Sequence, residues 1–171
     1  MRNTPVRFVA FSDFHAHNFT YGSKRVYFSP VSMGGPIKEG WYNSRFLDQI
    51  LALQEMFEYV VDHNIGLVVF CGDLFHKRQQ VSVDVANAVY KILNYYTSEC
   101  DIELVMIPGN HDYADRDGHV HSLEPLTHFR HSEARDTEIT VLDNATVTKI
   151  IHNVQFIPVP YTDDIDIARH Y

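Results

Sequence analysis

Three short motifs of histidine, carboxylate and amide side chains each follow a short apolar run, and this repetition constrains the fold more than any other feature of the sequence. The motifs are Ser12-Asp13-Phe14-His15, Gly72-Asp73-Leu74-Phe75-His76 and Gly109-Asn110-His111-Asp112. The apolar, β-branched runs that precede them, at 6–11, 67–71 and 104–107, predict buried strands. In an open α/β sheet, ligands bind at the carboxyl ends of the strands. We therefore expect the three motifs to converge on one crevice.

Amphipathic helical patterns separate these predicted strands. Apolar side chains recur at helical spacing over 44–64, with Ser44 as the predicted N-cap, and again over 83–96. Strands that alternate with helices at this spacing predict an α/β fold with right-handed βαβ crossovers. The rest of the chain predicts a short helix at 124–128, a strand at 139–142, and a hairpin of strands 146–151 and 154–159 that turns at His152-Asn153.

The motifs contain side chains that suit hard or borderline divalent ions. Asp13 and Asp73 offer carboxylate oxygens. Asn110 adds an amide oxygen, and His15 adds an imidazole nitrogen. This mixture suits manganese, iron or magnesium, and it lacks the thiolates that select zinc-cysteine sites. Because a carboxylate can bridge two ions about 3.5–4 Å apart, and such a pair holds the attacking and leaving oxygens of a phosphoryl displacement, Asp73 is the candidate bridge.

The other polar residues of the motifs have less specific expectations. His111 lies beside Asn110 and need not be a ligand itself, so it could face a leaving oxygen as a general acid. Asp112 could orient that imidazole or cap the following segment. His76 could contact substrate or buttress the site, or it could be purely structural. His17 is expected to contact a metal ligand without binding the ion itself, or to face solvent.

The series D-x-H, G-D-[LIV]-[FV] and G-N-H-[DE], in this order and with helical patterns between, resembles the calcineurin-like metallophosphoesterases. Within that family, the sequence looks most similar to the SbcD-type nuclease subunits of DNA repair and recombination complexes. The likeness rests on Gly-Asp-Leu-Phe-His-Lys-Arg at 72–78 and on Ile-Pro-Gly-Asn-His-Asp at 107–112, which is followed by Ser-Leu-Glu-Pro-Leu at 122–126. The resemblance implies a layered sheet sandwich flanked by helices.

The resemblance also implies roles for the motif residues. Asp13 and His15 would hold the first metal ion, and Asp73 would bridge to the second. Asn110 would hold that second ion, and His111 would be the catalytic histidine. The implied activity is that of a metal-dependent phosphodiesterase, an exonuclease or endonuclease that acts on DNA in end processing, repair or recombination. The resemblance further implies two divalent ions with manganese as the working ion, a homodimer, and an SMC-type ATPase partner of the SbcC kind.

Members of this family carry further metal-binding histidines later in the chain, typically a lone histidine at a strand end and then Gly-His-x-His. This chain stops at Tyr171, soon after a stretch at 156–161 that resembles the residues just before those histidines. We therefore expect the carboxyl-terminal part of the fold, and with it half of the metal site, to be absent from this polypeptide. Whether the chain is active by itself is then an open question.

The string Gly118-His119-Val120-His121 also spells Gly-His-x-His, but it lies only a few residues beyond the third motif. A motif counts only in the right structural context, so we interpret this string as a solvated loop that leads to Ser122 as an N-cap. Recruitment of His119 or His121 as a substitute metal ligand stays open as an alternative.

The composition is typical of one globular domain. The chain has 171 residues, of which 45% are hydrophobic, so 1–171 can bury one sizeable core. No apolar run approaches the ~20 residues needed to cross a bilayer, and no signal-peptide pattern precedes the first predicted strand. We expect a soluble, cytoplasmic protein with no membrane partner. Cys71 and Cys100 are interpreted as reduced thiols with a packing role.

The charge balance is acidic, with 14 lysines and arginines against 22 aspartates and glutamates. Proteins that bind nucleic acid usually show a basic footprint, because much of the affinity comes from neutralising phosphates. Bound divalent ions would reverse the local sign at the motifs. DNA affinity is nevertheless expected to depend on a partner or on an absent carboxyl-terminal region.

The stretch 18–41 is predicted to be a long irregular loop, because glycines and prolines recur in it. It contains aromatic and basic side chains, namely Tyr21, Lys24, Arg25, Tyr27, Phe28 and Trp41. Such residues hold single-stranded nucleic acid by stacking and charge, so the loop could be a substrate edge. The alternative is that these rings pack the loop onto the domain or form a subunit contact.

Two other functions remain open from the sequence. The same scaffold could serve a small-molecule or phosphoprotein phosphatase, which the acidic balance permits. Alternatively, a chain without the later histidines could be a catalytically incomplete fragment that docks a partner or dimerises. Metal content distinguishes this last possibility, because a competent site should take up two ions and a remnant one or none.

Overall fold

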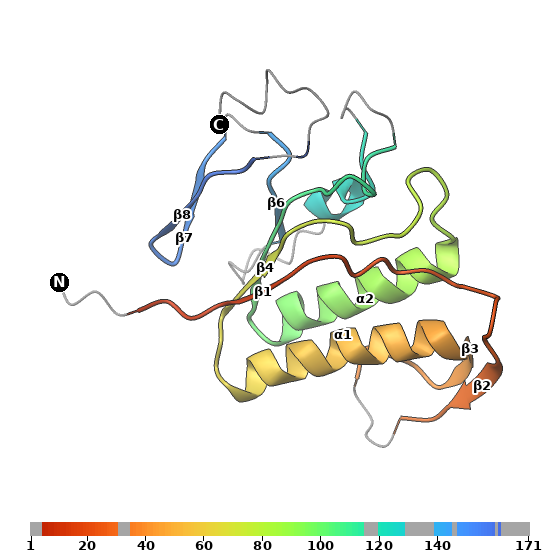
Figure 1. Ribbon diagram of the computed structural model, residues 1–171. Helices are drawn as coiled ribbons and strands as arrows, with labels where there is room; N and C mark the ends of the chain where they lie inside the picture. The colour runs from red at the N-terminus through yellow and green to blue at the C-terminus, as the bar shows by residue number, and fades with distance from the viewer. Residues whose placement is uncertain are drawn as a thin grey trace.

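A four-stranded parallel sheet lies at the centre of the fold (Figure 1). The structure, a computed structural model, describes residues 5–30, 35–114, 120–128, 139–144, 147–159 and 161. In spatial order the strands are β1 (Val9–Phe11), β4 (Leu67–Phe70), β5 (Glu103–Met106) and β6 (Ile139–Val141). All three neighbouring pairs are parallel. The α/β fold predicted from the sequence is therefore confirmed.

The first strand is shorter than predicted from its apolar run. Val9 pairs with Val68, near the start of β4, and residues 6–8 have no strand beside them among the described residues. The apolar run alone therefore did not predict the residue at which β1 begins. At the other end of the sheet, β1, β4 and β5 all run into the three sequence motifs, which puts the motifs at the carboxyl edge.

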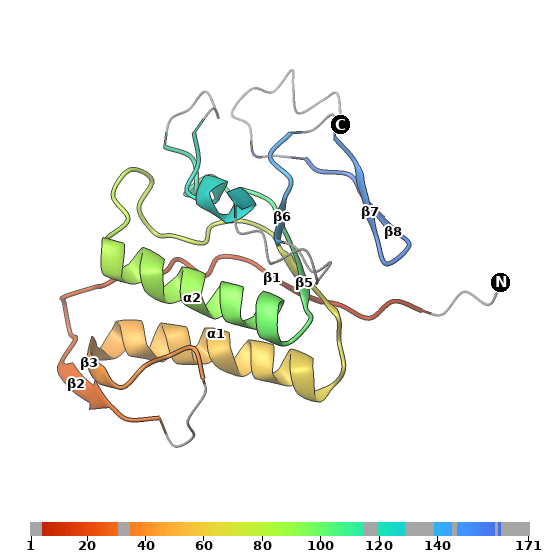
Figure 2. The same cartoon turned by 180° about the vertical axis from the view of Figure 1, so that it is seen from behind.

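Two helices, α1 (Ser44–Asp62) and α2 (Val83–Glu99), lie side by side on one face of the sheet (Figure 2). Side chains of a strand alternate between its two faces. Val68 and Phe70 of β4 point into the core formed with these helices, whereas Leu67 of the same strand belongs to a smaller cluster with Val105 and Leu142. Ile151 and Phe156 of a separate hairpin pack against that cluster. The second face of the sheet is therefore covered in part, where the hairpin packs.

The N-cap predicted for α1 was wrong by one residue. Oδ1 of Asn43 accepts hydrogen bonds from the backbone N–H of Arg45 at 3.0 Å and of Phe46 at 3.2 Å. Asn43 has extended backbone angles, as an N-cap requires, whereas Ser44 is already helical. The hydroxyl of Ser44 instead accepts a hydrogen bond from the N–H of Lys24.

The prediction of an irregular loop over 18–41 was wrong in part. This stretch contains β2 (Arg25–Phe28), which pairs antiparallel with β3 (Gly40–Asn43) in a separate two-stranded ribbon. Each strand has only four residues, so the alternation of side chains was too short to stand out beside the glycines and prolines. The ribbon lies at the amino-terminal end of α1, the end of the molecule toward which β1 runs (Figures 1 and 2).

The predicted hairpin is confirmed, with shorter strands, as β7 (Lys149–Ile151) and β8 (Val154–Phe156). His152 and Asn153 at its turn both have positive φ, at 49° and 64°, as a two-residue type I′ turn requires. The predicted short helix is a 3₁₀ helix, η1 (Glu124–His128). Thr146 and the tail from 162 to 171 lie outside the described residues.

The two cysteines differ in their surroundings. Cys100 is partly buried against the core, and burial raises the pKa of its thiol. Cys71 follows β4 and is exposed, so the packing role predicted for it was wrong.

Neither described helix is long and apolar enough to span a membrane.

Candidate metal centre

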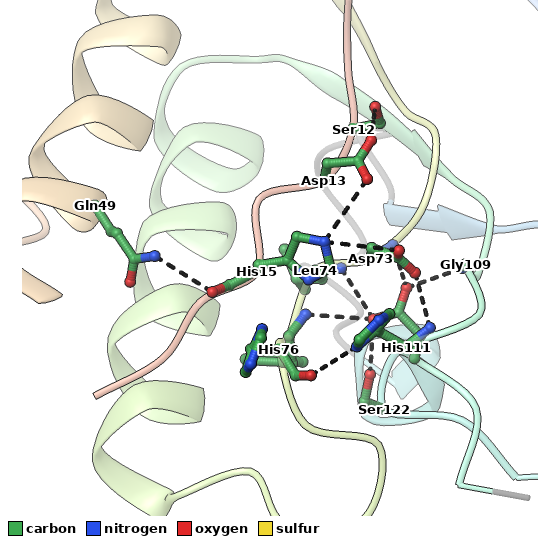
Figure 3. A network of polar contacts seen from close by, with 12 residues as sticks. Ser12, Asp13, His15, Gln49, Asp73, Leu74, His76, Gly109, His111 and Ser122 are labelled. Atoms are coloured by element: carbon green, nitrogen blue, oxygen red, sulfur yellow. Dashed lines mark hydrogen bonds and ion pairs between the residues drawn. The ribbon is translucent and has the colours of Figure 1, made fainter. Parts of the chain in front are cut away.

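The loops after β1 and β4 continue to pair beyond the ends of their strands. The N–H of Asp13 donates to the carbonyl of Gly72 at 3.0 Å, and the N–H of His15 donates to the carbonyl of Asp73 at 2.9 Å. Ala16 and Leu74 form the next bond of the same kind, at 2.8 Å. These bonds hold the first two motifs in fixed register, so Asp13 and His15 lie next to Asp73 (Figure 3).

Backbone conformation turns these three side chains toward one another. Asp13, His15 and Asp73 all have positive φ, at 56°, 48° and 64°. This left-handed region costs a residue with a β-carbon about 1–3 kcal/mol, and such outliers cluster at functional sites. Asn64, Asp101, His152 and Asn153 also have positive φ and lie outside the site, so this conformation shapes the site without identifying it.

The glycines of the second and third motifs allow the two loops to touch. A β-carbon added at Gly72, where φ is 101°, would lie 2.7 Å from the Cα of Gly109. A β-carbon at Gly109 would lie 2.2 Å from Oδ1 of Asp73 and 2.5 Å from its backbone nitrogen. No side chain fits at either position, so the backbones of the two motifs pack directly against each other.

The ligand atoms of Asp13, His15 and Asp73 lie within 4.8 Å of one another. Nε2 of His15 is 3.7 Å from Oδ1 of Asp13 and 3.8 Å from Oδ2 of Asp73, which is too far for hydrogen bonds. Ligands about 2.1 Å from a shared ion would show separations of this order. The other ring nitrogen of His15, Nδ1, is buried and has no hydrogen-bond partner. The donor set and its spacing therefore fit a divalent cation.

The amide of Asn110 lies beside the same carboxylate. With its nitrogen toward Asp73, it donates to both carboxylate oxygens, at 3.3 and 2.9 Å, while its oxygen accepts from Nη2 of Arg78 at 3.0 Å. In the opposite orientation the amide oxygen faces the carboxylate, an arrangement that only a cation between them would favour. The structure places the amide oxygen of Asn110 toward the carboxylate, where it could bind an ion, and Arg78 gains Asn110 as a partner only in the other orientation.

His111 is held at both its backbone and its ring. Its N–H donates to Oδ1 of Asp73 at 2.8 Å, and its Nδ1 lies 2.7 Å from the carbonyl oxygen of His76. A carbonyl oxygen can only accept, so Nδ1 carries a proton and Nε2 is the nitrogen left for chemistry. The rings of His111 and His15 meet edge to face, with centroids 4.8 Å apart.

Comparison with known proteins gives the same family that the motifs indicated. A family model for the calcineurin-like phosphoesterases matches residues 6–167. The chain belongs to this family. No curated protein matches the chain. As a calcineurin-like phosphoesterase, it is a phosphoester hydrolase of a class that uses divalent metal ions, and the group formed by Asp13, His15 and Asp73 provides candidate ligands.

A second group, made of three histidines, shares His15 with these candidate ligands. Ring nitrogens of His15, His76 and His111 also lie within 4.8 Å of one another. Burial lowers the pKa of His76, and the neighbouring His15 and His111 lower it further. His17 is half-buried, with its ring 5.3 Å from that of His76, and burial lowers its pKa as well. The substrate and support roles predicted for His76 and His17 stay predictions.

Asp112 supports the candidate metal centre in a way that its sequence position did not reveal. Its side chain is fully buried and accepts hydrogen bonds from the backbone N–H of Asp73 at 2.8 Å and of Gly109 at 2.9 Å. Its carboxylate also accepts from the N–H of Leu74, the N–H of Phe75 and the hydroxyl of Ser122. Burial raises the pKa of Asp112, and these hydrogen bonds oppose that rise. Asp112 therefore ties the second motif to the third, while the carbonyl of His76 orients the imidazole of His111.

Gln49 of α1 is another supporting residue that the sequence did not indicate. Its Nε2 donates to the carbonyl of His15 at 3.3 Å (Figure 3). Its Oε1 accepts from the N–H of His17 at 3.2 Å. Because the apolar pattern of α1 marks only its buried face, nothing in that pattern distinguishes this glutamine from a solvated one. Through these two bonds, α1 fixes the loop that carries the first motif.

Of the two alternative ligands in the string at 118–121, the structure describes only His121. His119 lies outside the described residues. His121 is buried, so the solvated-loop interpretation was wrong for it. Its Nε2 lies 3.2 Å from Oδ2 of Asp143, and His121 belongs to neither of the two groups of candidate ligands found among the described residues.

Proposed function

We propose that this chain is a metal-dependent phosphodiesterase that cleaves DNA, of the kind found in SbcD-type nuclease subunits. The observation that carries the proposal is the convergence of Asp13, His15 and Asp73 at the carboxyl edge of the sheet, with Asn110 and His111 beside them. The family assignment supports phosphoester hydrolysis. The motif Gly-Asp-Leu-Phe-His-Lys-Arg and its counterpart around Asn110 support the choice of a DNA nuclease within that family.

Asp13 and His15 would hold one divalent ion, Asp73 would bridge, and Asn110 would hold a second ion. Oxygen and imidazole donors of this kind suit manganese, and also magnesium or iron. A bound pair of ions stabilises charge on a phosphoryl group and holds the attacking and leaving oxygens. Because Oδ1 of Asp73 also accepts the N–H of His111, the bridging carboxylate and the catalytic histidine keep a fixed relative position.

His111 is the proposed general acid. The hydrogen bond from its Nδ1 to the carbonyl of His76 fixes the ring and leaves Nε2 to carry the proton that the departing sugar oxygen takes. Arg78 would be released when the amide of Asn110 turns its oxygen toward an ion. Its guanidinium would then be free to meet a phosphate oxygen of the substrate.

We propose a diester rather than a monoester as the substrate, with a neighbouring cavity taking the second esterified group. A cavity of about 320 Å³ lies beside the site, lined by His17, Phe75, Lys77, Ser82 and their neighbours. This volume falls within the range of small-molecule pockets, and its lining combines one apolar ring with one cation. We propose that it receives the nucleoside on one side of the scissile phosphate. A homodimer and an SMC-type ATPase of the SbcC kind are the proposed partners, and both rest on the resemblance alone.

Hydrolysis in the presence of Mn²⁺ tests this function. The substrates are bis-para-nitrophenyl phosphate, para-nitrophenyl phosphate and linear duplex DNA. We expect the diester and DNA to be cleaved faster than the monoester, and His111→Ala to lower kcat by about 10²- to 10⁴-fold. His63→Ala is the matched control, because His63 lies at the far end of α1 and stacks on Tyr59. Preference for the monoester would instead indicate a phosphatase, and no hydrolysis by the metal-loaded protein would indicate an interaction fragment.

A further inference from the structure

The inner face of the β2–β3 ribbon belongs to the hydrophobic core. Side chains alternate along each strand, and the antiparallel register places Val26 opposite Tyr42. Both residues, together with Phe28, pack against the core. The ribbon is therefore anchored, and its outer face is held in a defined position.

The outer face carries two exposed aromatic rings and a guanidinium. Tyr27 lies directly opposite Trp41, and their ring centroids are 5.3 Å apart. The side chains are 53% and 60% exposed. The guanidinium of Arg25 lies 5.3 Å from the centre of the Trp41 ring, in a cation–π contact. We call these three residues the aromatic strip.

The aromatic strip lies in the most cationic part of an acidic chain. Residues 18–45 contain four of the 14 lysines and arginines of the protein and only one of its 22 acidic residues. The four cations, all exposed, are Lys24, Arg25, Lys38 and Arg45. The single acid, Glu39, accepts a hydrogen bond from the hydroxyl of Tyr27, which holds that ring in place. This stretch therefore carries a net positive charge, opposite in sign to that of the chain as a whole and complementary to a polyanion.

A short, fixed path joins the proposed catalytic site to the strip. The ring of Phe19 lies 4.1 Å from that of His17 and 5.0 Å from that of His76. Nδ2 of Asn43, the last residue of β3, donates to the carbonyl of Phe19 at 2.7 Å. Tyr21, two residues further along, is 88% exposed. These contacts tie the loop that carries the first motif to the end of β3, so the strip lies at the same end of the molecule as the site.

We propose that the aromatic strip binds single-stranded DNA. Bases stack on Trp41 and Tyr27, and Arg25 with the neighbouring cations meets the phosphates. The inference rests on the proposed function as a DNA phosphodiesterase and adds a surface that holds one strand of the substrate beside the site. It also gives an acidic chain a local source of DNA affinity.

Fluorescence of Trp41 tests the proposal directly, because the chain contains a single tryptophan. The protein is titrated with oligothymidylate in EDTA, so that binding is measured without hydrolysis. We expect the fluorescence to be quenched as the strip fills, and the quenching to weaken as salt rises. A labelled oligothymidylate followed by anisotropy gives the affinities of the variants.

Trp41→Ala should weaken binding by about 5- to 100-fold, whereas Trp41→Phe, which keeps a ring, should retain most of it. Tyr59→Ala is the matched control, since Tyr59 is 54% exposed but lies near the other end of α1, and it should bind as the wild type does. Absence of quenching, or equal affinity of Trp41→Ala, would overturn the proposal. So would a loss of self-association in Trp41→Ala, measured by sedimentation, with DNA binding unchanged.

Failure of the strip and failure of the catalytic proposal are distinguishable. A protein that cleaves DNA but shows no quenching overturns the strip alone. A protein that binds oligothymidylate in EDTA but hydrolyses no phosphodiester with Mn²⁺ overturns the catalytic proposal alone.

Discussion

The backbone N–H of His111 donates a 2.8 Å hydrogen bond to Oδ1 of Asp73, a residue 38 positions earlier in the chain. This bond joins the second motif to the third at the two residues to which the proposed chemistry assigns the bridge and the acid. Asp112 reinforces the junction, because its carboxylate accepts the N–H groups of both Asp73 and Gly109. The geometry of the site therefore depends on contacts between loops as much as on the ligands themselves.

Replacing Gly109 with alanine should open this junction. The new β-carbon would lie 2.2 Å from Oδ1 of Asp73, so the carboxylate and the third motif must separate. We expect Gly109→Ala to lose both metal affinity and hydrolysis of bis-para-nitrophenyl phosphate. Gly35→Ala is the control, since its β-carbon would meet nothing closer than 3.9 Å. Calorimetric titration with Mn²⁺ measures the difference, and unchanged affinity in Gly109→Ala would contradict the close packing described here.

Asp112→Asn should destabilise the fold. An amide accepts hydrogen bonds only through its oxygen. The backbone N–H groups that bind the second carboxylate oxygen of Asp112 in the wild type would therefore be buried without a partner in the variant. Two such groups, at about 1–3 kcal/mol each, predict a loss of about 2–6 kcal/mol in the free energy of unfolding. Urea denaturation measures it. The exposed Asp62→Asn should change stability by less than about 0.5 kcal/mol, and an equally small effect of Asp112→Asn would refute its structural role.

Stability should fall at high pH, in part through Tyr90. Its hydroxyl donates a 2.6 Å hydrogen bond to the carbonyl of Ser122, and burial, with the charge of Asp112, raises its pKa to about 12. The unfolded chain loses the phenolic proton near pH 10, before the folded chain does. The contribution of Tyr90 is therefore present below pH 10 and is lost as the pH rises through about 12. Urea denaturation at several pH values should show a shallower decline in Tyr90→Phe, and the same slope as in the wild type would contradict the assignment.

The positions of the motifs were predictable from sequence because their signals are local. Apolar runs mark β4 and β5, and the glycines at 72 and 109 mark the tight turns that follow. The role of Asp112 was not predictable, because its partners are backbone N–H groups of residues up to 39 positions away, which carry no sequence signature. The role of Gln49 was not predictable for the same reason, because its partners are backbone groups of His15 and His17. The β2–β3 ribbon was missed because four-residue strands give too little alternation to outweigh the glycines around them.

Titration with Mn²⁺ by isothermal calorimetry tests most directly the central claim that Asp13, His15 and Asp73 hold a shared cation. We expect the wild type to bind Mn²⁺. His15→Ala and Asp73→Asn should each weaken binding by at least about tenfold, because replacing a residue that only hydrogen-bonds to a metal ligand already lowers metal affinity by about that factor. The double variant should lose less than the sum of the two free energies, since both act on one ion. Asp62→Asn should bind as the wild type does. A wild-type protein that takes up no Mn²⁺, or variants that bind it equally well, would contradict the account.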